Sequence, residues 1–333
     1  MRILVLGGTA WLGHTFAAAA QEAGHHVTCV ARGDAVPPGV HLVRADRDQD
    51  SALAPLAEER WDAVVDVARQ PGHVRRAVRD LREAASRYIF VSTGNVYATQ
   101  EGLGADEDAA LSPPLDGDVM TTMDEYGPAK VACEDAVLEA FGADRSVIAR
   151  AGLIGGPGDP SGRTSYWVQR FAHPSNDAGT VLVQDAPDLP TAQIDVRDLA
   201  EWLLLTAVEQ RSGIFNAMGH PVPFPEYIAT AQSVTGHTGA VVAAPEKWLL
   251  ERGVGQWSGE RSLPLWLADR TWYGMNARSN ARAVAAGLRF RPLRDTLADT
   301  LAHDVLPLAE GPLGAGLTDA EETFLLQAYT EAL

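Results

Sequence analysis

The sequence predicts an α/β protein: a doubly wound parallel sheet with a smaller α/β domain toward the C-terminus. Three observations lead to this prediction. Short apolar runs alternate with helix-length segments through the first half of the chain. A glycine-rich turn over Gly7–Gly13 joins the first apolar run to the first helix. The alternation stops after Gly155-Gly156-Pro157-Gly158, which indicates that a second domain begins there.

Each apolar run is short and rich in aliphatic residues, as expected for strands covered on both faces of a sheet. Strand, helix and strand in succession imply parallel pairing with right-handed crossovers. The expected strands are 3–6, 27–30, 40–43, 63–67, 88–91, 147–154, 181–184 and 213–217. The expected helices are 13–22, 73–85, 127–141, 194–207 and one that follows the Thr318–Glu321 capping box.

Residues 1–155 and about 191–217 are expected to form the sheet domain, and about 156–190 and 218–310 the smaller domain. Residues 311–333 are expected to hold a C-terminal helix that docks on its own subunit. Between 99 and 125 the chain holds eight acidic residues and no lysine or arginine, so a long loop is expected there. Long loops in compact domains are often functional, and a solvated acidic loop is the alternative.

Composition restricts the class of partner. The chain has 333 residues and a net charge of −17, a surface that repels nucleic acid and anionic membranes, so a small-molecule partner is expected. No apolar stretch is long enough to span a membrane, and the N-terminal run is too short for a signal peptide. Cys29 and Cys133 are expected to be buried free thiols, which fits a reducing cytoplasm. No metal site is expected, and a homodimer is one of the possible oligomeric states.

The Gly7–Gly13 turn has the character of a phosphate-binding loop. A glycine turn between a strand and a helix lets the backbone approach a pyrophosphate at the helix N-terminus. Ala10 stands where the common fingerprint has its second glycine, so the approach is expected to differ slightly. A tight turn without a ligand is the alternative. The expected cofactor-binding residues of this segment are Gly7, Thr9, Ala10, Trp11, Leu12 and Gly13.

The end of the second strand indicates the type of dinucleotide. An acidic residue there would bind the ribose 2′-hydroxyl of NAD, whereas an arginine accommodates the 2′-phosphate of NADP. Ala31 occupies the acid's position and Arg32 follows it, so Arg32 is expected to pair with that phosphate. NADP(H) is therefore favoured, with NAD(H) as the alternative. Asp46, which ends the third strand, is expected to meet the adenine edge. For Arg32 and for Asp46 the alternative is a solvated side chain that binds no ligand.

Tyr126 and Lys130 lie four residues apart in an expected helix, and therefore on one face of it. A phenol beside an ammonium ionises more readily, because the positive charge favours phenolate. Such a group suits proton transfer in alcohol–carbonyl chemistry. The Tyr-x-x-x-Lys pattern alone is weak, but here it stands downstream of the glycine turn and of a strand that ends in Ser92-Thr93. This order and spacing indicate catalysis.

Together these segments resemble the short-chain dehydrogenase/reductase superfamily, in its extended branch of NAD(P)-dependent epimerases, dehydratases and reductases. The resemblance covers nearly the whole chain and implies a Rossmann-type sheet. The matching segments are Gly7–Gly13, Phe90–Tyr97, Tyr126–Lys130, Arg150–Gly158, Ile194–Ala200 and Asn280–Pro292.

The resemblance implies a role for each of three side chains. Tyr126 is expected to be the general acid/base, and Thr93 to orient the substrate oxygen. Lys130 is expected to lower the pKa of Tyr126 and to bind the nicotinamide ribose, so Tyr126 and Lys130 also count as cofactor-binding. Ser92 is the weaker candidate beside Thr93, because neighbouring residues of a strand point to opposite faces.

Two departures from the family pattern matter. Dehydratases of the family follow the threonine with Asp-Glu, whereas Gly94-Asn95 stands here, which argues against dehydration. The fourth strand of the family ends in small residues beside the cofactor. Ala68 fits this pattern and is expected to bind the cofactor, but Arg69-Gln70 follow it and leave that wall of the site open to question.

The second domain is expected to select the substrate. If 164–170 is helical, Arg163, Tyr166 and Arg170 share one side of it and, with Asn95, line a substrate pocket. A packed helix with solvated arginines is the alternative.

The favoured function is an oxidoreductase that moves a hydride between a nicotinamide and a carbonyl or secondary alcohol, with reduction favoured. A nucleotide-sugar epimerase with the same Thr93, Tyr126 and Lys130 is one rival. A non-catalytic NADP-binding sensor or RNA-binding relative is another. The intact three residues argue against a sensor, and the acidic surface argues against RNA.

Overall fold

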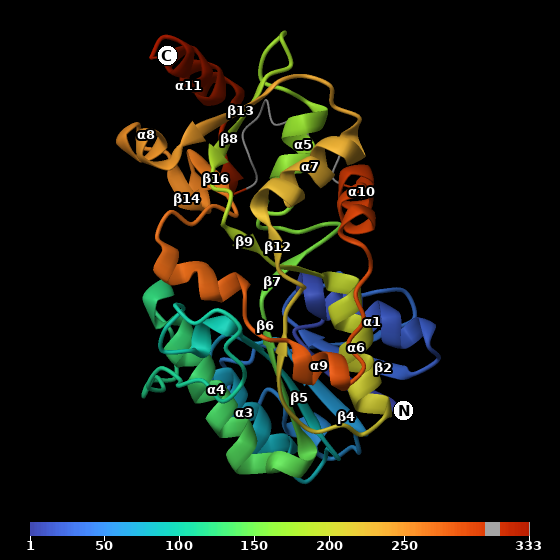
Figure 1. Ribbon diagram of the computed structural model, residues 1–333. Helices are drawn as coiled ribbons and strands as arrows, with labels where there is room; N and C mark the ends of the chain where they lie inside the picture. The colour runs from blue at the N-terminus through green and yellow to red at the C-terminus, as the bar shows by residue number, and fades with distance from the viewer. Residues whose placement is uncertain (304–313, 333) are drawn as a thin grey trace. The chain divides into compact units, whose positions relative to one another are not determined.

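The chain divides into two compact units in the computed structural model, which describes residues 1–303 and 314–332 (Figure 1). The boundary between the sheet domain and the smaller domain falls after Gly152, three residues before the expected one. Residues 191–195, expected in the sheet domain, belong to the smaller domain. The return of 278–289 to unit 1 was not expected from the sequence. Of the expected segments, 304–313 and 333 lie outside the described residues. Unit 1 comprises Met1–Gly152, Val196–Gly219 and Arg278–Arg289, and unit 2 comprises Leu153–Asp195, His220–Ala277 and Phe290–Leu333.

Unit 1 contains the predicted doubly wound sheet. Its seven strands run in the order β11-β6-β5-β4-β1-β2-β3, and every neighbouring pair is parallel. The order reverses direction at β1, as it does in Rossmann-type sheets, so the predicted fold class is confirmed. The strands are β1 (Arg2–Leu6), β2 (His26–Ala31), β3 (His41–Arg44), β4 (Ala63–Asp66), β5 (Tyr88–Thr93), β6 (Ser146–Ala151) and β11 (Gly213–Ala217).

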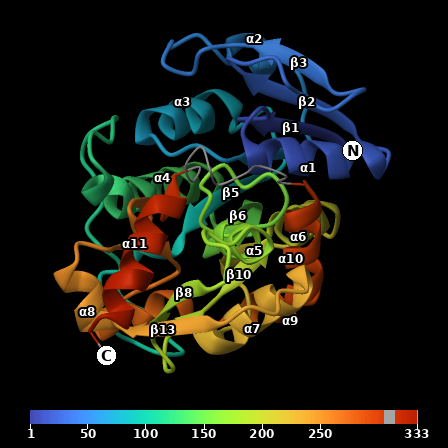
Figure 2. The ribbon, with the colours of Figure 1, turned by 90° about the horizontal axis from the view of Figure 1, so that it is seen from above.

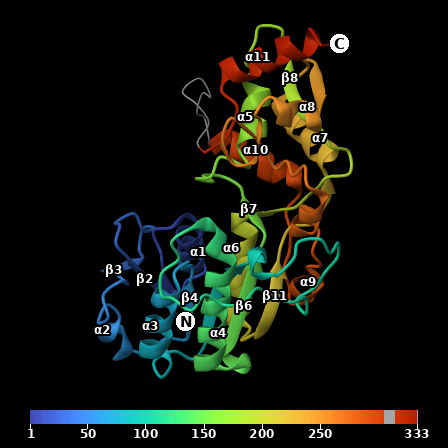
Figure 3. The same cartoon turned by 90° about the vertical axis from the view of Figure 1, so that its left-hand side faces the viewer.

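Helices cover both faces of this sheet. Figure 2 shows α3 and α4 on one side of the strands and α1 and α6 on the other. α3 and α4 lie side by side, as Figure 3 also shows. This cover explains why the strands are apolar on both faces. The helices of unit 1 are α1 (Trp11–Glu22), α2 (Ala54–Ala57), α3 (Pro71–Leu81), α4 (Tyr126–Phe141), α6 (Val196–Val208) and α9 (Ala281–Ala285).

The register of the parallel strands places the turns after β1, β4 and β5 at the same end of the sheet. Leu6 of β1 pairs with Asp66 of β4, and Asp66 pairs with Phe90 of β5. Parallel strands end at the same edge, so the turns after β1, β4 and β5 are neighbours. The expected strand 147–154 is interrupted at Gly152: β6 stays in the large sheet, while β7 (Leu153–Gly155) pairs with β10 (Gln193–Asp195) in unit 2.

The two cysteines are buried free thiols, as expected. Burial raises the pKa of Cys29 and of Cys133 to about 12. Neither thiol is therefore a reactive thiolate near neutral pH.

Unit 2 is built from short strands and helices around a separate core that includes Trp167 and Trp266. Its strands pair in small two-stranded sheets, which explains why no continuous alternation marks them in the sequence. The further strands are β8 (Val181–Asp185), β9 (Pro190–Thr191), β12 (Val222–Pro223), β13 (Val241–Pro245), β14 (Gly255–Trp257), β15 (Gly259–Glu260), β16 (Ser262–Pro264) and β17 (Ala315–Gly316). The helices are α5 (Tyr166–Ala172), α7 (Phe224–Thr235), α8 (Glu246–Glu251), α10 (Leu293–His303) and α11 (Asp319–Thr330).

The C-terminal helix α11 docks on its own unit, as predicted, and begins with the predicted capping box of Thr318 and Glu321. In the part of the chain that the structure describes, every helix is too short or too polar to cross a bilayer.

Candidate active site

The turn between β1 and α1 requires glycine at two places. Gly7 has a φ of +99°, which side-chain-bearing residues rarely adopt. A Cβ atom on Gly13 would lie 2.2 Å from the carbonyl oxygen of Gly7, so the first turn of α1 packs directly on the loop backbone. α1 has no acidic residue in its first turn. The partial positive charge of the helix N-terminus is therefore not neutralised by an acidic side chain of its own first turn, which favours binding of an anion.

A cleft of about 510 Å³ opens beside this turn, at the ends of β1, β2, β3 and β4. It brings together most of the residues that the sequence assigned to the cofactor. Trp11, Leu12 and Gly13 do not line it but form the start of α1, and Tyr126 and Lys130 do not line it either. The predicted residues along the cleft are Gly7, Thr9, Ala10, Arg32, Asp46 and Ala68.

Arg32 supplies a cation to this cleft. It is exposed and follows Ala31, the last residue of β2, so β2 itself ends without an acidic residue, while Asp46 after β3 lines the same cleft. Sequence reasoning left the wall beyond Ala68 open, and the structure places Arg69, Gln70 and His73 there. Together the α1 N-terminus, the glycine backbone and the arginines fit an anionic dinucleotide.

The turn after β5 contacts the start of α4. Thr93 is buried at the end of β5, and its Oγ1 accepts a hydrogen bond from the amide of Asn95 at 3.3 Å. A Cβ atom on Gly127 would lie 2.3 Å from the carbonyl oxygen of Asn95. The glycine of the Tyr-Gly-x-x-Lys segment thus permits the first turn of α4, which begins with the half-buried Tyr126, to lie close to the backbone of Asn95.

Lys130 is held from two sides. Its side chain is 2% exposed, and Nζ donates to the carbonyls of Ala68 at 2.8 Å and Val91 at 2.5 Å. The ammonium also lies 4.2 Å from the centre of the Phe90 ring. An ammonium has three N–H donors, so two are used by the protein backbone and one remains for another acceptor. Lys130 shares its helix face with Tyr126, four residues before it.

A buried ion pair fixes α4 to the sheet behind these residues. Arg150 of β6 and Glu134 of α4 are both 2% exposed, and Nη2 lies 2.7 Å from Oε2. Ser92 donates to the other carboxylate oxygen of Glu134 at 2.5 Å, which is why Ser92 faces away from the Thr93 side of the strand. Glu134 was not among the residues expected from the sequence, although it lies four residues after Lys130 on the same helix face.

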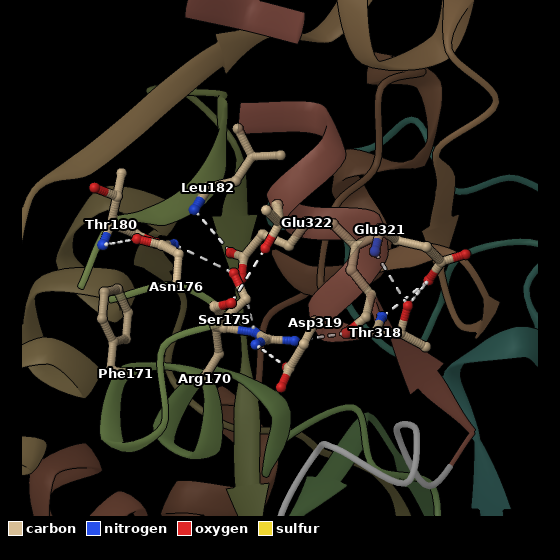
Figure 4. A network of polar contacts seen from close by, with 12 residues as sticks. Arg170, Phe171, Ser175, Asn176, Thr180, Leu182, Thr318, Asp319, Glu321 and Glu322 are labelled. Atoms are coloured by element: carbon tan, nitrogen blue, oxygen red, sulfur yellow. Dashed lines mark hydrogen bonds and ion pairs between the residues drawn. The ribbon is translucent and has the colours of Figure 1, made fainter. Parts of the chain in front are cut away.

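The proposed substrate residues of unit 2 require a correction. α5 exists, but Tyr166 is 1% exposed and Arg170 is fully buried, so neither lines an open pocket. Arg170 binds α11: its Nη1 lies 2.6 Å from Asp319 and its Nε 3.1 Å from Glu322 (Figure 4). The alternative, a packed helix with solvated arginines, is wrong for Arg170, because this arginine is buried. The reason is that α5 is surrounded by unit 2, and helical spacing alone does not distinguish a pocket face from a packed one.

Arg163 is placed differently. It is half-buried, its Nε donates to Ser161 at 3.1 Å, and its guanidinium lies 5.4 Å from the centre of the Trp257 ring. Asn95 is exposed at the turn after β5. These two residues remain candidates for substrate contact.

Comparison with known proteins agrees with this geometry. The sequence model described as the NAD dependent epimerase/dehydratase family matches residues 3–217. This chain belongs to that family. The match spans the glycine turn, the end of β5 and the whole of α4, so it covers the candidate site of unit 1. The family is described as NAD dependent, which supports a nicotinamide dinucleotide as the cofactor.

Individual proteins that resemble this chain do so at low sequence identity. The chain is 27% identical to the 2′-dehydrokanamycin reductase of Streptomyces kanamyceticus over 264 residues, 76% of this chain and 72% of that protein. It shares the fold of the UDP-N-acetylglucosamine 4-epimerase of Bacillus cereus, with a TM-score of 0.65, 16% identity and coverage of 91% and 98% of the two chains. The UDP-glucose 4-epimerase of Thermus thermophilus, solved in complex with NAD, gives a TM-score of 0.64, 20% identity and coverage of 92% and 100%.

Proposed function

We propose that this protein is an NADP(H)-dependent reductase that converts a ketone on a small sugar-like substrate into an alcohol. The observation that carries the proposal is the contact of Gly127 with the Asn95 carbonyl, which brings the start of α4 to the turn after Thr93. This turn lies at the sheet edge that also carries the dinucleotide cleft.

The reduced nicotinamide, when bound, would supply a hydride to the carbonyl carbon. Tyr126 donates its phenolic proton to the oxygen on which negative charge develops. Thr93 orients that oxygen by a hydrogen bond. The remaining N–H of Lys130 is available to the ribose hydroxyls, and its positive charge favours the phenolate that forms when Tyr126 loses its proton.

NADP(H) is the proposed cofactor because of Arg32. The guanidinium carries a fixed positive charge and can form two parallel hydrogen bonds to a phosphate. A carboxylate at the position of Ala31 would instead bind the free 2′-hydroxyl of NAD. A readily exchanged NADP(H) suits net reduction, which consumes one reduced dinucleotide in each turnover.

A ketone on an amino-bearing sugar is the substrate class we propose. The name of the 27% identical relative supplies the first probe, 2′-dehydrokanamycin. The net charge of −17 supports a cationic substrate, because a strongly acidic surface attracts cations over long distances. Low salt should therefore increase the rate of substrate capture.

The test is a panel of keto sugars, with and without amino groups, followed by the loss of NADPH absorbance. The expected result is oxidation of NADPH with an amino-bearing keto sugar, faster at low salt than at high salt. Absence of NADPH oxidation across the panel, by a protein that binds NADPH, would count against the reductase. Equal turnover of neutral and amino-bearing sugars would overturn the substrate class alone.

A nucleotide-sugar epimerase is the second candidate. The family description names epimerases, two proteins of the same fold are UDP-sugar 4-epimerases, and Thr93, Tyr126 and Lys130 would serve that reaction too. An epimerase returns the hydride to its substrate and therefore keeps its dinucleotide bound. Mass spectrometry of the denatured protein distinguishes the two: stoichiometric NAD carried through purification would favour the epimerase, and an empty protein that binds added NADPH would favour the reductase.

A further inference from the structure

A buried carboxylate, Asp66, is hydrogen-bonded to Arg47, which lines the cleft beside the glycine turn, and to Ala68, whose carbonyl accepts from Lys130 of α4. It is the last residue of β4 and is fully buried. Its Oδ1 accepts from Arg47 Nη1 at 2.8 Å and from the amide of Ala68 at 2.9 Å. Its Oδ2 accepts from Arg47 Nη2 at 2.7 Å and from the Tyr88 hydroxyl at 2.6 Å. A carboxylate offers about four acceptor positions, so all four are occupied.

Arg47 fixes this cluster from the side of the cleft. It lines the dinucleotide cleft, and its Nη2 also donates to the carbonyl of His73 at 2.9 Å. The bidentate pairing of Arg47 with Asp66 holds the carboxylate in the plane of the guanidinium group. Tyr88 binds from the neighbouring strand β5. The carboxylate therefore has little freedom to rotate.

Asp66 in turn fixes the backbone of Ala68. The bond from the Ala68 amide to Asp66 Oδ1 closes a tight turn two residues long, of the kind that aspartate side chains commonly stabilise. The carbonyl of the same residue, Ala68, accepts the 2.8 Å hydrogen bond from Lys130 Nζ. A continuous chain of hydrogen bonds thus runs from Asp66 through one peptide residue to the lysine.

We propose that Asp66 is a positioning residue for Lys130: together with Arg47 and Tyr88 it sets the Ala68 carbonyl, and this carbonyl directs the lysine's remaining N–H toward the ribose and Tyr126. The inference rests on the proposed role of Lys130 in the reaction. The coupling between Asp66 and Lys130, on which the proposal depends, can be measured without a substrate.

The chain offers an unusually direct measurement, because its sequence contains only two lysines, Lys130 and Lys247. Protein labelled with [13Cε]lysine should therefore give two side-chain NMR signals. The Lys247 side chain is 88% exposed and serves as an internal reference. The Lys130 signal should respond to any change in the acceptors around its ammonium.

Three variants make the test. Asp66→Asn keeps the size of the side chain but replaces one acceptor oxygen with a donor. Tyr88→Phe removes one of the four hydrogen bonds and keeps the pairing with Arg47, so it guards against failure of the first variant to fold. Ile89→Val, in the same strand as Tyr88 and equally buried, controls for loss of packing.

The expected result is a displaced Lys130 signal in Asp66→Asn, a smaller displacement in Tyr88→Phe and none in Ile89→Val, with Lys247 unchanged throughout. NADPH affinity should fall by about threefold to tenfold in Asp66→Asn, the equivalent of one net hydrogen bond. A folded Asp66→Asn protein with the wild-type Lys130 signal would overturn the proposal. Failure of the wild-type protein to bind NADPH would count against the proposed function instead, since the NMR measurement decides the coupling by itself.

Discussion

Gly127 and Asn95 are in van der Waals contact through their backbones, and a side chain at position 127 would collide with the Asn95 carbonyl at 2.3 Å. The glycine at position 127 therefore lets the first turn of α4, the helix that carries Tyr126 and Lys130, pack against this backbone. It also makes the position of Tyr126 depend on the turn that carries Thr93, so the two side chains are expected to act on one substrate oxygen.

Replacement of Tyr126 by phenylalanine should lower kcat by about 10²–10⁴, because general acid catalysis is lost while the ring is retained. NADPH binding should be nearly unchanged. Thr93→Val should cost less, about one hydrogen bond to the substrate oxygen. Steady-state kinetics on a confirmed substrate, with fluorescence titration of NADPH, checks the order. Near-full turnover of Tyr126→Phe would mean that the proton comes from another group.

Replacement of Arg32 by alanine should weaken NADPH binding by about 10- to 100-fold, the loss of a charge-assisted hydrogen bond, and leave NADH binding almost unchanged. Isothermal titration calorimetry with both dinucleotides measures this selectivity. Arg79→Ala removes the same charge from an exposed arginine of α3, outside the cleft, and should affect neither affinity. Equal affinities for the two dinucleotides before and after the Arg32 change would falsify the assignment.

Glu134→Gln should destabilise unit 1, by about 3–5 kcal/mol if Arg150 is left as an unpaired buried charge. Urea unfolding followed by circular dichroism gives the free energy of unfolding. Glu139→Gln is the matched control, because Glu139 is an exposed residue of the same helix and its change should stay within about 0.5 kcal/mol. Similar values for both variants would show that the buried pair has little net effect.

Arg170→Met should loosen the attachment of α11, since Glu322 would remain buried without its cation. The expected cost is again that of a broken buried pair, about 3–5 kcal/mol. Hydrogen exchange should report faster exchange of α11 amides in the variant. The exposed Arg270, which lies 3.5 Å from Asp188, provides the control Arg270→Met. Unchanged exchange in α11 would indicate that apolar contacts alone hold the helix.

Asp66 should make stability depend on acid pH. Burial by itself would raise the pKa of Asp66, but the charge of Arg47 and the hydrogen bonds from Arg47, Tyr88 and Ala68 hold it below its ordinary value. The folded state then binds fewer protons than the unfolded state, so this contribution is complete above about pH 4 and is lost as the pH falls through the folded pKa. The stability difference between wild type and Asp66→Asn should therefore be constant near neutrality and shrink below about pH 4. Urea titrations across this range measure it, and a difference that grows toward acid pH would contradict the assignment.

The sequence was most informative where a single local pattern decides the structure. β1, the glycine turn and α1 follow one another within the first residues of the chain, and Tyr126 and Lys130 need only the helical repeat to share a face. The pairing of Arg47 with Asp66 could not be read in this way, because β1 and β2 lie between β3 and β4 in the sheet and the contact depends on the path that the chain takes after β3. The burial of Tyr166 and Arg170 depends on α11, which lies far along the chain. Long-range packing of this kind leaves no periodic trace in the sequence.

Each unit of this protein is made of three separate segments, so the chain passes from one unit to the other at five junctions. Neither unit can therefore be obtained by cutting the gene at one point. During synthesis unit 1 remains incomplete until Arg289 has left the ribosome, although its sheet is finished at Ala217. An exchange of unit 2 for that of another family member, as a way to alter substrate choice, would need three inserts rather than one.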